Sequence, residues 1–401
     1  MQTDNIGRKL ILFLLNPFLS AINSLKDIRD GESHKILYLW FLMFGIGFCV
    51  VNDQLDSFRI IEDFEWIKNM SLNSYMAYLR EYLTFDSNIK DIYATTVQFL
   101  VSRFTNNYHW CFLIFAAVFG FFYIKSLRIF LRYENVSTNW VFYVLLFMFC
   151  YSNSIFNING MRFWTAAWIG VYTALSVILD RNYKALLWLV LTPFIHGSFI
   201  IWPLLLAIAF LSQRYQKVWI TLFVASSFVS AVSYLNILQD YSYLLPQFMQ
   251  NQVYSYTEAD RALRIMAGET SYGVAYADFL NNLPGYLRLI MSYILIFNLK
   301  DINLNIDSKR LMGIFLSLAT ITNFLSGIPS MGRYQTLTIP LLLIIWAMNH
   351  DYLSKYDKVF CFVPLAYFYS VLYWYRHISS VTEFYLYAMP APITIIQYLF
   401  Y

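Results

Sequence analysis

Apolar stretches long enough to cross a lipid bilayer follow one another along almost the whole chain. The stretch at 138–156, for example, contains no charged residue. A helix crosses the hydrocarbon core in about 20 apolar residues, and broken helices need fewer. The sequence therefore predicts an all-α polytopic membrane protein with about 12 transmembrane helices, within a range of about 10 to 14. The predicted spans are 36–51, 109–131, 138–156, 161–179, 183–195, 197–211, 218–235, 284–299, 309–327, 333–349, 358–375 and 384–401.

The chain has too few charged residues to form the water-facing surface of a soluble protein. Only 13% of the 401 residues are charged and 59% are hydrophobic, whereas soluble domains carry about 25% charged residues. Lipid must cover most of the surface, so we expect a single membrane domain over residues 1–401. Within it, 1–35 is expected to be cytoplasmic or to lie in the interface, because Asn16-Pro17 interrupts a short apolar run there.

The lysines and arginines predict the orientation. If the chain reverses direction at His196, every main basic cluster falls on one side, which the positive-inside rule assigns to the cytoplasm. The polar segments 52–108 and 236–283 then lie outside, as a cavity roof, a substrate surface or a loosely ordered linker. The clusters are Arg8, Lys9, Lys26, Arg29 and Lys35; Lys125, Arg128 and Arg132; Arg181 and Lys184; Arg214 and Lys217; Lys300, Lys309 and Arg310; and Lys355 and Lys358.

Several arginines break this rule because they fall at the outer ends of predicted spans. Arg162, Arg288 and Arg333 each follow a glycine closely and are predicted to lie in the first turn of a helix. A cation there opposes the helix dipole unless an anion is bound, and an arginine fork at a helix N-terminus suits phosphate or pyrophosphate. The alternative is that each arginine extends to lipid headgroups.

Other candidate residues lie near the same side. His196 stands between Pro193 and Gly197 and could be a base, a phosphate ligand or a packing residue. Weaker candidates are Asp56, Arg59, Arg261, Arg264 and Tyr334. The four cysteines, Cys49, Cys111, Cys150 and Cys361, lie in apolar runs without metal-ligand spacing. With no dinucleotide fingerprint or P-loop, the sequence predicts no metal, no cofactor and no nucleic-acid partner.

Three short stretches resemble the EpsG/Wzy-type polysaccharide polymerases of bacterial inner membranes. They are Asp53 to Arg59; Gly160-Met161-Arg162 with Phe194-Ile195-His196-Gly197-Ser198; and Gly332-Arg333-Tyr334. The resemblance implies a GT-C-like architecture in the inner membrane, with a cytoplasmic N-terminus and an active site facing the periplasm. It implies metal-independent, inverting transfer of a glycan from undecaprenyl pyrophosphate onto the non-reducing end of a lipid-linked repeat unit, for O-antigen, capsule or exopolysaccharide.

The resemblance also assigns roles. Arg162, Arg288 and Arg333 would hold the pyrophosphate, and His196 would act as base or orient the acceptor. Arg261 and Arg264 would guide a substrate, with Asp56, Arg59 and Tyr334 as further binding residues. The expected partners are undecaprenyl-pyrophosphate-linked oligosaccharides and the bilayer, with a chain-length regulator left open. Alternative functions are an O-antigen ligase, a flippase or transporter for lipid-linked oligosaccharides, and a membrane acyltransferase.

Overall fold

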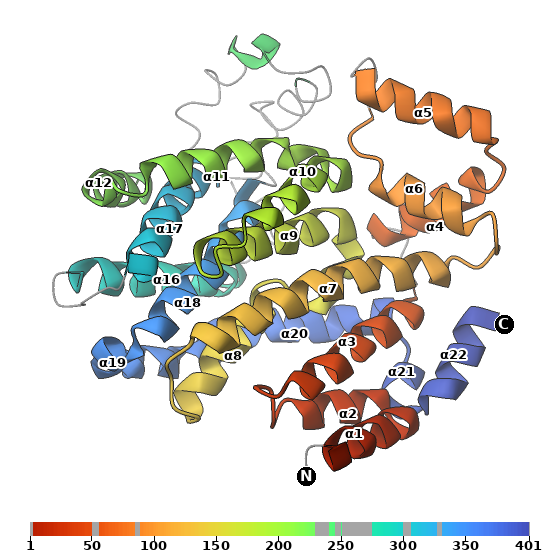
Figure 1. Ribbon diagram of the computed structural model, residues 1–401, viewed down its shortest axis with the longest axis horizontal. Coiled ribbons are helices and arrows are strands. Elements are labelled where there is room, and N and C mark those ends of the chain that lie inside the picture. The colour runs from red at the N-terminus through yellow and green to blue at the C-terminus, as the bar shows by residue number, and fades with distance from the viewer. Residues whose placement is uncertain are drawn as a thin grey trace.

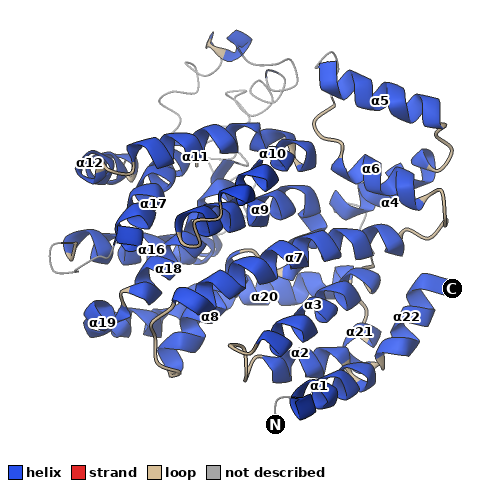
Figure 2. Ribbon diagram, viewed as in Figure 1, coloured by secondary structure: helices blue, strands red, loops and turns tan. Residues whose placement is uncertain are grey.

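The described part of the chain is helical throughout, apart from its connecting turns. The computed structural model describes residues 3–49, 56–84, 89–228, 240–244, 250, 275–299, 306–326 and 331–400. Within these ranges no strand is present, and the only extended pairing is an isolated bridge between Phe48 and Thr382. Figure 2 shows this uniformly helical architecture. The prediction of an all-α protein is confirmed.

Helices cover most of the described residues in the ranges predicted as spans, although several of these ranges divide into a 3-10 turn and an α-helix. The α-helices are α1 (Thr3–Leu15), α2 (Pro17–Ser24), α3 (Gly31–Ile46), α4 (Asp56–Ile67), α5 (Leu72–Thr84), α6 (Tyr93–Val101), α7 (His109–Tyr133), α8 (Trp140–Ser152), α9 (Met161–Ile178), α10 (Leu186–Ile195), α11 (Ile201–Ser212), α12 (Gln216–Ser226), α16 (Ala275–Phe297), α17 (Ile306–Leu325), α18 (Thr338–Met348), α19 (His350–Leu353), α20 (Val363–Val381), α21 (Tyr385–Ala388) and α22 (Ala391–Phe400). The 3-10 helices are η1 (Ile155–Gly160), η2 (Tyr183–Ala185), η3 (Gly197–Ile200), η5 (Ser242–Leu244), η6 (Met331–Leu337) and η7 (Ser354–Phe362).

The N-terminal apolar run forms two helices rather than one. Asn16 separates them, and its side-chain oxygen accepts a hydrogen bond of 2.9 Å from the backbone N–H of Leu19. Pro17 occupies the first position of α2, where its missing N–H costs no hydrogen bond. The interruption at Asn16-Pro17 is therefore present, and α1 and α2 pack against each other and against α3.

Helices α3 and α7 approach each other closely at Gly45. A β-carbon at this position would lie 2.5 Å from the Ala116 Cβ and 2.6 Å from the carbonyl oxygen of Phe112. On the α7 side, Phe112, Phe115 and Phe119 are fully buried. Small residues allow helix backbones to approach in this way, as they do in membrane bundles.

Gly45→Ala is expected to destabilise the protein by about 1–3 kcal/mol, because the added methyl group overpacks a backbone contact. The measurement is thermal or denaturant unfolding of the purified protein. Gly31→Ala is the matched control, since no atom lies within 4 Å of the added carbon. An equal loss of stability in both variants would contradict this account of the α3–α7 contact.

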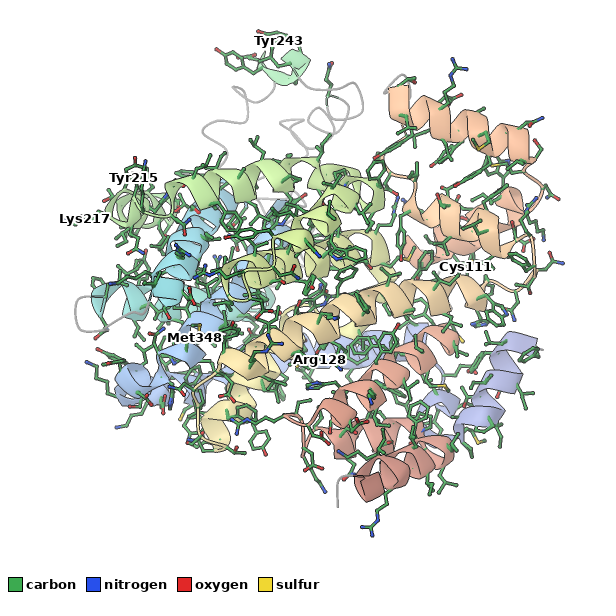
Figure 3. All side chains as sticks on the ribbon, viewed as in Figure 1. Cys111, Arg128, Tyr215, Lys217, Tyr243 and Met348 are labelled. Carbon is green, nitrogen blue, oxygen red and sulfur yellow. The ribbon has the colours of Figure 1, made fainter. Side chains whose placement is uncertain are left out.

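Polar loops gather at one end of the molecule, which we call the basic end. Ion pairs join Arg29 to Glu134 and Arg132 to Asp180, and a third joins the residue after Asp180, in the same loop, to Asp307 at the start of α17. Figure 1 shows α12 and α19 at one edge of the molecule and α4, α5 and α6 at the opposite edge. Figure 3 likewise places Lys217 near the first edge and Cys111 toward the second. The structure thus brings the predicted cytoplasmic clusters of the described loops together.

The chain reverses direction at His196. The loop before α10 lies at the basic end, where Arg181 pairs with Asp307. The turn after α11 lies there too, because Gln216 Nε2 donates to the Lys309 carbonyl oxygen at 2.7 Å. Between them, His196 has extended backbone, with φ −152° and ψ 117°. The broken-hairpin prediction is correct, since both arms return to the same end.

Within the described residues, two helical stretches are long and apolar enough to cross a membrane by length and composition. One is α7, and the other is Trp140–Ile178, in which α8, η1 and α9 follow in succession. Four shorter apolar stretches are Tyr183–Ile195, Gly197–Ser212, Asn282–Phe297 and Ala391–Phe400. Buried core helices of soluble proteins can meet the same criterion, so two stretches do not establish a count of about 12 spans.

Candidate functional site

A polar cavity of about 260 Å³ lies under the three helices α4, α5 and α6, which we call the cap helices. Three cations line it, and two carboxylates accompany them, so its formal balance is +1 when both carboxylates are ionised. We call it the cap cavity. Its lining residues are Arg59, Ile60, Asp63, Tyr78, Ile89, Lys90, Asp91, Ala94, Thr95 and Arg162.

The first turn of α9 places Arg162 in this cavity. The 3-10 turn η1 precedes α9 and ends at Gly160, so the chain bends before the arginine. Buried Asn153 fixes the bend, because its amide donates to the Trp164 carbonyl oxygen at 3.0 Å while its own carbonyl accepts from the Trp168 indole at 2.9 Å. The predicted position of Arg162 at a helix N-terminus is correct.

Hydrogen bonds attach the cap helices to the helical body. Ser57 Oγ donates to Asn159 Oδ1 at 2.7 Å. On the other side, the Ile92 N–H donates to the Phe194 carbonyl oxygen at 3.1 Å, and Tyr82 Oη donates to the Pro193 carbonyl oxygen at 3.2 Å. The cap helices are therefore held against both η1 and the hairpin that contains His196.

Asp91 is a buried carboxylate in the wall of the cap cavity. Its side chain is only 4% exposed, and its two oxygens lie 3.3 and 3.4 Å from Arg162 Nη1. Burial raises the pKa of Asp91 above its ordinary value, while the charge and hydrogen bond of Arg162 and the backbone N–H of Gly197 oppose that rise. Asp63, across the cavity, also has a pKa raised mainly by burial. The cavity can thus hold an anion and a proton acceptor side by side.

Behind the cavity, three side chains from two elements form a hydrogen-bonded chain. Tyr334 Oη donates to Ser198 Oγ at 2.6 Å, and Ser198 Oγ lies 2.7 Å from His196 Nδ1. Burial, then the charges of Arg162, Arg333 and Lys90, lower the pKa of His196 far below its ordinary value. The imidazole is therefore neutral. If the Ser198 hydroxyl donates its hydrogen bond to Nδ1, the ring proton is on Nε2, which is then a hydrogen-bond donor.

The predicted site residues separate into distinct groups. Arg162 and Arg59 line the cap cavity together. Tyr334 joins His196, and Arg333 is exposed on η6, near enough for its charge to lower the pKa of that histidine. The side chain of Asp56 lies outside the described residues, as do Arg261 and Arg264 entirely.

Arg288 lies elsewhere, and the prediction that it occupies a first turn is wrong. Helix α16 begins at Ala275 and contains Pro284, so Arg288 is in its interior. The arginine is 5% exposed, and it donates to Asn323 Oδ1 at 3.0 Å and to Thr338 Oγ1 at 3.4 Å. It does not line the cap cavity.

Arg333 also departs from the predicted geometry. It lies in the 3-10 helix η6, five residues before α18 begins at Thr338, rather than in the first turn of an α-helix. The pattern Gly332-Arg333-Tyr334 correctly marked a change of direction before an apolar helix. The pattern could not distinguish a 3-10 turn from the first turn of an α-helix. Either kind of turn places polar residues before the apolar run.

Sequence reasoning missed Asp91, Lys90, Tyr78 and Ser198. Asp91 lies in a polar segment beside other charged residues, and nothing local marks it as buried. Ser198 was within the Phe194–Ser198 pattern, but its contact with Tyr334 spans 136 positions. Among the described residues, no group of three or more His, Cys, Asp and Glu side chains is arranged to hold a metal ion.

Comparison with known protein families, with curated proteins and with solved structures finds no match to this chain.

Proposed function

We propose that the chain is a bacterial inner-membrane polysaccharide polymerase of the EpsG/Wzy type, which transfers a glycan from undecaprenyl pyrophosphate onto a lipid-linked repeat unit. The observation that carries this proposal is the cap cavity, in which Arg59, Lys90 and Arg162 share the lining with the buried carboxylate of Asp91, which pairs with Arg162. Such a site offers cations for a pyrophosphate leaving group and a base for an acceptor hydroxyl.

The surface supports placement in a membrane with about 12 spans. Helices α10 and α11 expose large apolar side chains along their length, including Leu187 at 72%, Val190 at 61% and Leu204 at 60%. Soluble monomers rarely expose contiguous apolar patches of this kind, because water would be in contact with them. Lipid would cover these faces, with the basic end in the cytoplasm and the cap helices in the periplasm.

Arg162 is the best-placed pyrophosphate ligand. It stands in the first turn of α9, where backbone N–H groups and the positive end of the helix dipole favour an anion. Its side chain is 43% exposed, so it can reach a ligand while it remains near Asp91. Arg59 and Lys90 supply two more positive charges around the same space. Together they would stabilise the charge that develops as the pyrophosphate departs.

Asp91 is proposed as the base. The acceptor hydroxyl oxygen forms a bond to the anomeric carbon of the donor, while the bond from that carbon to the pyrophosphate oxygen breaks. The acceptor proton passes to Asp91, and the electron pair leaves with the pyrophosphate, which the cations hold. Attack opposite the leaving group inverts the anomeric centre. A raised pKa makes Asp91 a better proton acceptor than an ordinary aspartate.

His196 then has an orienting role, which was one of its two predicted roles. Its low pKa makes it a weak base. Its bond to Ser198, which Tyr334 fixes in turn, leaves Nε2–H as a donor. We propose that this N–H positions a sugar hydroxyl, and that Arg288 stabilises the bundle through Asn323 and Thr338.

The test is deletion of the gene in the organism that carries it, followed by re-expression and analysis of surface glycan length on a gel. The proposal predicts single repeat units after deletion and a ladder of lengths after re-expression. Loss of all surface glycan with retained long chains on the carrier lipid would indicate a ligase. Accumulation of single lipid-linked units on the cytoplasmic face would indicate a flippase. Either outcome would refute the polymerase assignment.

A further inference from the structure

A second cavity, of about 640 Å³, lies at the basic end, on the opposite side of the molecule from the cap cavity. The turn between α11 and α12 forms one wall, and the start of α17 forms the other. We call it the basic-end cavity. Its lining residues are Phe210, Leu211, Gln213, Arg214, Gln216, Ile306, Lys309 and Arg310.

Close backbone packing fixes the two walls relative to each other. Gln216 Nε2 donates to the Lys309 carbonyl oxygen at 2.7 Å. At Gly313, a β-carbon would lie 2.3 Å from the Gln213 carbonyl oxygen, so only glycine permits the approach. These contacts between the α11–α12 turn and α17 therefore fix the walls of the cavity.

All the charged side chains that line the basic-end cavity are positive. Arg214, Lys309 and Arg310 contribute three cations, and no lining residue is acidic. Asp307, on the same first turn of α17, forms an ion pair with Arg181. The positive-inside rule accounts for cations at this end of the molecule, but not for their convergence on one cavity.

A further observation indicates what would occupy the cavity. Leu211 is 78% exposed and Ile306 is 69% exposed beside the cations. A ligand that satisfies the cations and these apolar side chains is an amphiphile with an anionic head and an apolar tail.

We propose that the basic-end cavity binds the headgroup of an anionic phospholipid, with its acyl chains against Leu211 and Ile306. Basic pockets between helices on the cytoplasmic side of membrane proteins bind acidic lipid headgroups in this way. The proposal does not depend on the glycosyl-transfer function, because none of its residues belongs to the cap cavity.

The test is lipid binding to the purified full-length protein in a neutral detergent, measured by native mass spectrometry. The protein is titrated with phosphatidylglycerol and, for comparison, with phosphatidylcholine. The proposal predicts retained phosphatidylglycerol in preference to phosphatidylcholine. The variant Arg214→Gln/Lys309→Gln/Arg310→Gln should weaken phosphatidylglycerol binding about 100-fold, because each cation near an anionic headgroup contributes about fivefold. All three side chains are exposed, so the variant is expected to fold.

A matched control removes the same charge at the same end of the molecule. Lys184, Lys355 and Lys358 are exposed and lie outside the cavity lining. Their triple replacement with glutamine should leave phosphatidylglycerol binding nearly unchanged. Equal loss in both triple variants, or full binding in the cavity variant, would overturn the proposal.

A third experiment distinguishes the binding of a lipid from the binding of a free anion. Leu211→Gln/Ile306→Gln should weaken phosphatidylglycerol binding while it leaves inorganic phosphate binding unaffected. If inorganic phosphate binds the wild type as tightly as the lipid does, the cavity is a phosphate site and the lipid assignment is wrong. Thermal unfolding without added lipid checks that each variant remains folded.

Discussion

Arg162→Ala is expected to lower the rate of glycan transfer by about 10²–10³-fold, which reduces a ladder of surface glycan to single repeat units. The substitution removes a cation from the first turn of α9, at the place where the proposed pyrophosphate leaving group would gain charge. Arg162→Lys should recover only part of the activity, because a lysine keeps the charge but loses the two-pronged contact with phosphate oxygens. Glycan length on a gel and the rate in membranes measure both effects.

Arg80→Ala is the matched control for this prediction. Arg80 is an exposed arginine of cap helix α5 that does not line the cap cavity. Its removal changes the charge of the same region and should leave the ladder intact. Expression level and unfolding temperature must stay close to wild type for Arg162→Ala, since the change also leaves Asp91 without its partner. A full ladder from folded Arg162→Ala would refute the pyrophosphate assignment.

Asp91→Asn is expected to lower the transfer rate by about 10²–10⁴-fold, because an amide cannot accept the acceptor proton. The substitution preserves the shape of the side chain and an oxygen for Arg162, so the cavity should persist. The pH profile separates a base from a merely structural group. The proposed base must be deprotonated to accept a proton, so the wild-type rate is expected to fall as the pH falls through the raised pKa of Asp91.

This fall in rate at low pH, the acid limb of the profile, should begin at a higher pH than it would for an aspartate with an ordinary pKa. The acid limb should be absent from the residual activity of Asp91→Asn. Glu62→Gln, an exposed carboxylate on α4 outside the cavity lining, should keep both the rate and the limb. Asp63 is the competing carboxylate within the cavity. If Asp63→Asn abolishes the limb while Asp91→Asn keeps it, Asp63 is the base instead.

The sequence was most informative where local chemistry decides the structure. Apolar runs and helix-breaking residues predicted the all-α class, the break at Asn16-Pro17 and the reversal at His196, all of which the structure contains. Arg162 was found because a cation at a helix start is unfavourable without an anion. Each of these signals resides within a few neighbouring residues.

The sequence was least informative where tertiary contacts decide. Asp91 is buried against Arg162, 71 positions away, and no local pattern marks that burial. Arg288 was predicted at a helix start because Pro284-Gly285 is typical of a boundary, but α16 continues through both. Its polar partners come from α17 and α18, which satisfy the arginine without a ligand. The assignments of Arg261 and Arg264 remain predictions.

The most direct test of the central claim uses purified protein in liposomes, supplied with an undecaprenyl-pyrophosphate-linked repeat unit from its own host. The quantities measured are glycan length and released undecaprenyl pyrophosphate. The account predicts multiples of one repeat, with one carrier lipid released for each new glycosidic bond, and loss of both products in Arg162→Ala and Asp91→Asn. Lipid-linked units that cross the bilayer without lengthening, or lengthening that persists in both variants, would contradict it.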